Sequence, residues 1–91
     1  MSAVSLEDEV LEGDRARTLL EDPTLNKMFD DLQKQYMAAW ASSETKDQDG
    51  RERLFHAINV LSDIRVHLRV MADSGHLAQE HLTRLKKGTK K

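Results

Sequence analysis

The segment from Arg51 to Leu85 most constrains the fold of this chain, because it carries an apolar row long enough to build a core around. Read in steps of three and four, one seam passes through Leu54, Ala57, Leu61, Ile64, Leu68, Met71, Gly75, Ala78, Leu82 and Leu85. This heptad spacing predicts a helix that packs against other helices. Further apolar surface lies around the same helix at Phe55, Ile58, Val60, Val66 and Val70. We therefore expect this helix to contact more than one neighbour.

A second helix is predicted to begin at Asp22-Pro23. Aspartate accepts hydrogen bonds from the first free amides of a helix, and proline at the next position has its φ already set. The helix should run to about Ala41 or Ser42. Its apolar seam consists of Leu25, Phe29, Leu32, Tyr36 and Ala39.

The N-terminal region is acidic and has few apolar residues, so we expect residues 1–13 to form a flexible arm or a short, weakly held helix. Gly13 marks a break, and a short helix should follow from Asp14. Residues 14–85 then form the helical domain. Residues 86–91 form a basic tail, which we expect to be disordered.

The long C-terminal segment also carries signals for where its helix begins and ends. Asp49, with Glu52 three residues later, predicts the N-cap after a polar loop. We favour an end near Ala72, because Gly75 is typical of a helix stop, with a fourth short helix from His76 to Lys87. The alternative is one continuous helix, since the heptad register passes through Gly75 without a slip.

These elements predict an all-α fold. Its centre is an antiparallel helical hairpin, Pro23–Ala41 against Arg51–Ala72, with short flanking helices. The chain has 91 residues, near the lower limit for a self-sufficient core. We expect the hairpin to be completed as a helical bundle by oligomerisation, as a dimer or a larger assembly.

The sequence does not encode a recognisable catalytic or metal site. It has no cysteine, and its four histidines are His56, His67, His76 and His81. Two ligands on one helix face must be three or four residues apart, and no two of these histidines are. Its isolated glycines do not form a phosphate-binding loop. We therefore predict a non-enzymatic protein without a cofactor or metal. A signal peptide and a membrane-spanning apolar run are also missing, which favours a cytoplasmic protein without membrane contact.

Charge is unevenly distributed along the chain. Residues 1–49 carry twelve acids and five bases, a net charge of −7, and residues 50–91 carry four acids and nine bases, a net charge of +5. The basic half suggests phosphate contacts without base reading. The candidate nucleic-acid contacts are Arg65, Arg69, Arg84, Lys86, Lys87, Lys90 and Lys91. A third reading takes the acidic half as a nucleic-acid mimic that inhibits a host enzyme.

Tryptophan and tyrosine near the end of the second helix suggest a partner surface, since these residues dominate interface energetics. In an antiparallel hairpin Trp40 would lie opposite Leu54, Phe55 and Ile58 in an aromatic cluster. The candidate residues for an oligomer or partner interface are Tyr36, Trp40, Phe55, Leu61, Ile64, Leu68 and Met71.

Three segments together resemble a group of small phage and prophage proteins of unassigned activity. They are RARTLLEDP (Arg15–Pro23), MFDDLQKQYMAAWASSETKDQDGRERL (Met28–Leu54) and VHLRVMADSGHLAQEHL (Val66–Leu82). Shared features are the RA..LLe.P start, the tryptophan that closes the second helix, the D..GRE.L junction and the HL...m..G.la...l end. The acidic N-terminus and the lysine tail depart from that pattern.

The resemblance implies a phage-encoded helical protein that acts in virion assembly or DNA packaging, in the host cytoplasm or the virion, with no active site to carry over. We therefore expect a helical oligomerisation or protein-interaction module. A second copy, another phage protein or a host protein would be its partner. The alternative is a DNA-binding accessory protein of the packaging machinery.

Overall fold

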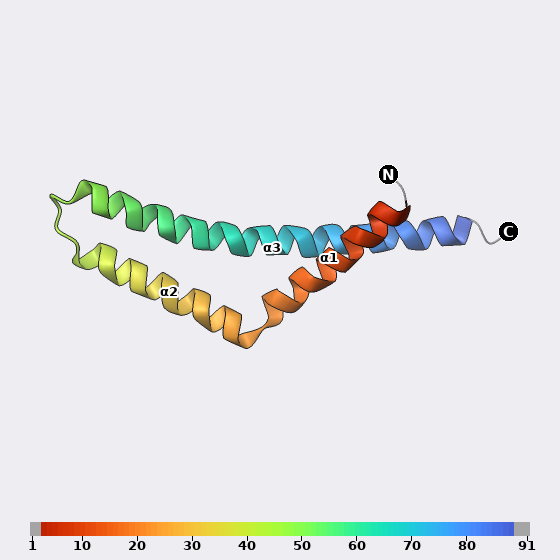
Figure 1. Ribbon diagram of the computed structural model, residues 1–91, viewed down its shortest axis with the longest axis horizontal. Helices are drawn as coiled ribbons and strands as arrows, with labels where there is room; N and C mark the ends of the chain where they lie inside the picture. Colours follow the sequence, from red (N-terminus) through yellow and green to blue (C-terminus); the bar gives the residue numbers. More distant parts are fainter. Residues whose placement is uncertain (1–2, 89–91) are drawn as a thin grey trace. The chain divides into compact units, whose positions relative to one another are not determined.

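A computed structural model describes residues 3–88 as three α-helices (Figure 1). They are α1 (Ala3–Glu21), α2 (Pro23–Ser42) and α3 (Gln48–Gly88). The described residues contain no strand, so the predicted all-α class is confirmed. None of the described helices is both long and apolar enough to cross a bilayer.

The chain divides into two compact units. Unit 1 combines α1 with the part of α3 from His67 onward, and unit 2 comprises Asp22–Val66. Helix α3 thus contributes to both units and packs against α1 in one and α2 in the other. The prediction that this helix contacts more than one neighbour is confirmed.

Of the two states expected for the acidic N-terminus, the structure has the helix, which begins at Ala3 and continues through the expected break at Gly13 to Glu21. Leu6 shows why. Its side chain is only 2% exposed and forms an apolar cluster with Ala78 and Leu82 of α3, against which Val10 packs. Leu6 and Val10 of the acidic segment are four residues apart and pack against a helix distant in sequence. The composition of the segment itself does not predict that contact.

Helices α1 and α3 meet backbone to backbone at Gly13 and Gly75, which are both buried. A methyl group on Gly75 would lie 2.7 Å from Gly13 Cα and 3.0 Å from the carbonyl oxygen of Glu9. A methyl group on Gly13 would lie 2.6 Å from Gly75 Cα. Only hydrogen fits at both positions, so this pair sets the spacing of the two helices.

The direction of the helices in unit 1 follows from the same contacts. Gly13 meets Gly75, whereas Leu6, earlier in α1, clusters with Ala78 and Leu82, later in α3. From Leu6 to Gly13 the residue number rises along α1, while the contacted residues of α3 fall from Leu82 to Gly75. The two segments are antiparallel.

The favoured helix end near Ala72 is wrong, as is the separate fourth helix. Helix α3 is continuous from Gln48 to Gly88, because Gly75 serves a close helix contact and not a left-handed stop. Lys86 and Lys87, expected in a disordered tail, lie in the last turn of α3. Lys90 and Lys91 lie outside the described residues.

The two predicted helix starts have different outcomes. Asp22 caps α2 as expected, and its Oδ1 accepts a hydrogen bond from the Leu25 amide at 2.8 Å. Helix α3, however, begins at Gln48 and not after Asp49. Asp47 Oδ1 accepts from the Gly50 amide at 3.0 Å, which makes Asp47 the capping side chain and leaves Asp49 in the first turn.

The core of unit 2 is thin. Phe29 is its buried apolar side chain, at 7% exposure. Around it the structure half-buries Leu25, Leu32 and Tyr36 of α2 and Leu54, Ala57, Ile58 and Leu61 of α3. Most of the two predicted seams is thus turned inward. Ala39 is exposed.

We expect Gly75→Ala to destabilise unit 1. Alanine improves helix propensity by about 1 kcal/mol, but its Cβ meets backbone atoms that have no freedom to move aside, which costs about 1–3 kcal/mol or more. Urea unfolding followed by circular dichroism measures the net change. Gly88→Ala is the matched control, because nothing lies within 4 Å of a methyl group there. Equal or greater stability of Gly75→Ala than of Gly88→Ala would contradict the close-contact account.

Candidate interaction surfaces

Apolar side chains are far more often exposed than buried in the described residues. The buried ones are Leu6, Ala16, Phe29, Ala78 and Leu82. Twelve large ones are 40% exposed or more: Leu11, Leu19, Met28, Met37, Trp40, Phe55, Val60, Ile64, Val66, Val70, Leu77 and Leu85. Where such side chains gather on one side of a helix, they are candidates for contact with another protein.

In unit 2 the exposed apolar residues of α3 form two stripes. Phe55 and Val66 are eleven residues apart, about three turns, and share one side of the helix. Val60 and Ile64 are four apart and share another, about 140° away. All four are 43–57% exposed. We call them the unit 2 stripes; they flank the face that α2 covers.

The candidate interface residues separate into two groups. Trp40, Phe55 and Ile64 are exposed. The others are half-buried: Tyr36 and Leu61 in unit 2, and Leu68 and Met71 in unit 1. Ile64 is more exposed than its seam neighbours Leu61 and Leu68, which are half-buried.

Trp40 meets an arginine rather than the expected aromatic cluster. The guanidinium carbon of Arg51 lies 4.4 Å from the centre of the Trp40 ring, within the range of a cation–π interaction. Phe55 instead packs edge-on against its neighbour His56, with 6.4 Å between ring centres. The sequence analysis did not identify Arg51 as a partner of Trp40. Its place in the first turn of α3, after a short loop, brings it near the end of α2.

Arg65, a candidate phosphate contact, is bound within unit 2. Its Nη2 donates to Asp30 Oδ1 at 2.8 Å and to the Asn26 carbonyl oxygen at 3.1 Å. Its guanidinium carbon lies 5.0 Å from the Phe29 ring centre. The Nε atom is buried and makes no hydrogen bond within the described residues. This arginine therefore ties α3 to α2.

A small hollow adjoins this arginine. It measures about 220 Å³ and is lined by Phe29, Gln33, Leu61, Ser62 and Arg65. The lining combines an amide, a hydroxyl and a guanidinium with two apolar side chains, but no nucleophile–base pair. It lacks the parts of a catalytic site.

The other candidate phosphate contacts that the structure describes are exposed. They are Arg69, Arg84, Lys86 and Lys87. The structure does not bring Arg65 and Arg69 into one cationic site, since Arg65 is committed to Asp30. Contact with phosphates would fall on the C-terminal turns of α3.

The histidines are exposed and dispersed. His76 Nε2 lies 3.3 Å from Glu80 Oε1, one turn along α3. Within residues 3–88 no three histidine, aspartate or glutamate side chains converge in a metal-binding group. On α2, Lys27 donates to Asp31 Oδ2 at 2.6 Å, and this bond raises the pKa of Lys27 above its usual value. That pair is a helix-surface contact.

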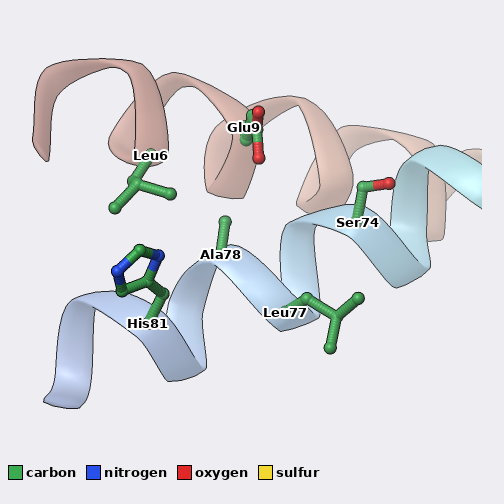
Figure 2. A pocket seen from close by; sticks show the side chains of 6 residues that line it. All are labelled: Leu6, Glu9, Ser74, Leu77, Ala78 and His81. Atoms are coloured by element: carbon green, nitrogen blue, oxygen red, sulfur yellow. The ribbon is translucent and has the colours of Figure 1, made fainter. Parts of the chain in front are cut away.

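Unit 1 carries an open notch between α1 and α3, with a volume of about 240 Å³. Its lining is Leu6, Glu9, Ser74, Leu77, Ala78 and His81. Figure 2 shows Leu6 of α1 and Ala78 of α3 pointing toward each other at its floor. Leu77 at its edge is 62% exposed. Sequence analysis missed Leu77, although it continues an off-seam row that begins seven residues earlier at Val70.

Comparisons with protein-family models, with curated proteins and with solved structures found no match to this chain. The resemblance to small phage proteins therefore stays a prediction. The functional argument rests on the surfaces described above.

Arg65→Ala is expected to destabilise the protein by about 1–2 kcal/mol, because it removes hydrogen bonds of a charged group to α2 and its packing over the Phe29 ring. Arg69→Ala, one turn further along and exposed, should change stability by no more than about 0.5 kcal/mol. Chemical unfolding of both variants measures the difference. Equal effects would mean that Arg65 does not hold α2 to α3.

Proposed function

We propose that this protein is a non-enzymatic helical module whose role is to associate with copies of itself or with another protein. In this proposal α2 and the first half of α3 form a hairpin, and a second copy covers its exposed apolar surface to complete a helical bundle. The phage setting in virion assembly or DNA packaging belongs to the proposal and rests on the sequence resemblance.

The observation that carries the proposal is the exposure of the unit 2 stripes. A single partner helix covers one face of α3, yet Phe55 and Val66 on one side and Val60 and Ile64 on the other are left open to solvent. Because each of these side chains is already about half covered, its burial by a partner contributes about 1 kcal/mol. Burial of both stripes therefore supplies a driving force for association.

The Trp40–Arg51 pair supports the same surface. Tryptophan and arginine are enriched among the residues that contribute most to binding between proteins. Trp40 is 40% exposed at one end of unit 2, on the side of α2 that meets α3. A partner that covers the stripes extends onto this pair.

The test is the mass of the protein in solution, measured by light scattering and sedimentation at high micromolar concentration. We expect an oligomer, and we expect Phe55→Asp to dissociate it, because a charge would be buried in the contact. Ala38→Asp is the matched control: it places the same charge on α2 at an exposed position about 200° from Tyr36. A strict monomer, or equal effects of the two substitutions, would refute the proposal.

A second candidate function is DNA binding in a packaging complex. It is favoured by the exposed Arg84, Lys86 and Lys87 in the last turns of α3. Such a cluster contacts phosphates without reading bases. Because Arg65 is hydrogen-bonded to α2, the phosphate contacts on α3 would be limited to this end of the helix and to Arg69.

Fluorescence anisotropy with duplex DNA over a salt series tests this second function. If three phosphates are contacted, the logarithm of the binding constant falls with the logarithm of salt concentration with a slope of about −2.7. Replacing Arg84, Lys86 and Lys87 by glutamine should remove binding, whereas Arg65→Gln should not. No binding at low salt would exclude DNA association.

A further inference from the structure

The cationic end of α3 lies beside the beginning of α1, which is acidic. Leu6 of α1 packs against Ala78 and Leu82 of α3, and Figure 2 shows Leu6 and Ala78 pointing toward each other. Seven residues after Leu6, Gly13 meets Gly75. Because the two segments are antiparallel, the first turns of α1 accompany the last turns of α3.

Acids outnumber bases at this end of unit 1. Residues 3–12 of α1 carry four acids and no base, whereas residues 78–88 of α3 carry one acid and three bases. These charged residues are Glu7, Asp8, Glu9 and Glu12 on α1, and Glu80, Arg84, Lys86 and Lys87 on α3. Counting Lys90 and Lys91, which follow in the sequence, makes the numbers of acids and bases equal. A phosphate that meets these bases therefore also meets an equal number of acids.

The register of the two helices sets how far apart the opposite charges lie. It places Glu7 and Asp8 level with residues 80 and 81 of α3. Arg84 is three to four residues further along, about 5–6 Å at 1.5 Å per residue, and Lys87 is about 9–11 Å further along. Side chains on a helix tilt toward its N-terminus, so in this antiparallel pair the acids of α1 lean toward the end of α3 and the bases lean back toward them.

We infer that the first turns of α1 restrain phosphate binding by the end of α3. The inference rests on the second candidate function, DNA contact through Arg84, Lys86 and Lys87. Among the described residues, Glu7 and Asp8 form no ion pair, so their charges act outward. The Debye length is about 8 Å at physiological salt, so phosphates bound to these bases lie within the field of both acids and are repelled by them.

Glu7→Gln combined with Asp8→Asn tests the inference. Both side chains are exposed, so neither substitution opens the core. Fluorescence anisotropy with labelled duplex DNA should show binding about 3- to 10-fold tighter than that of the wild-type protein at about 50 mM salt, because two repulsive charges are removed. The gain should shrink as salt is added, since the Debye length falls to about 3 Å at 1 M.

Glu52→Gln combined with Asp63→Asn is the matched control. It removes two exposed acids of α3 and so changes the net charge by the same amount. Asp63, the nearer of the two, is about six turns of helix before Arg84, several Debye lengths away. The control should change DNA affinity by less than about 2-fold.

A further variant locates the effect. It joins Glu7→Gln and Asp8→Asn to glutamine replacements of Arg84, Lys86 and Lys87. If the acids act on phosphates held by these bases, the gain in affinity should be lost in this variant. A gain that persists would place the effect elsewhere and overturn the inference.

The outcomes separate the inference from the DNA-binding function. Wild-type binding that Glu7→Gln with Asp8→Asn leaves unchanged, or raises no more than the control does, would overturn the inference and leave DNA binding standing. Binding by the neutralised variant but not by the wild-type protein would support the inference and show that the acids prevent the contact. No binding by either protein would overturn both. Circular dichroism of each variant checks that the helices are retained.

Discussion

A pair of helices buries only one side of each member, and this limit underlies most features of the protein. In each unit α3 has one partner helix, and the side chains that point away from that partner remain in contact with water. The apolar content of α3 exceeds what two partners in succession can cover. Exposed Phe55, Val60, Ile64 and Val66 in unit 2, and Val70 and Leu77 in unit 1, are the consequence. Association with another molecule is the simplest way to remove them from water.

The two units are held by different kinds of contact. In unit 1 the helices approach so closely at Gly13 and Gly75 that side chains are excluded, and small residues, Ala16 and Ala78, are buried nearby. In unit 2 a long side chain spans the gap, with Arg65 hydrogen-bonded to the first turns of α2 and placed over Phe29. The first contact depends on the absence of Cβ atoms, and the second depends on one guanidinium.

Charge has two roles in this chain. Arg65, which the sequence alone suggests as a phosphate contact, pairs with Asp30, and Arg51 lies over the Trp40 ring, so both belong to the internal structure of unit 2. Among the described residues, Glu9 and Glu12 of α1 and Arg84 near the end of α3 form no ion pair. The asymmetry of charge along the sequence thus becomes, in unit 1, an asymmetry between two helices that lie side by side.

Local sequence was sufficient for features that a few neighbouring residues determine. The Asp22-Pro23 start of α2, the apolar seams and the need of α3 for several neighbours all follow from spacing of three or four residues along one helix. The role of Gly75, the helical state of residues 3–13 and the internal role of Arg65 depend on residues about 35 to 80 positions away. A glycine that ends a helix and a glycine that admits another backbone look the same in sequence. Only the arrival of the second helix distinguishes them, because the close contact exists between segments and not within either one.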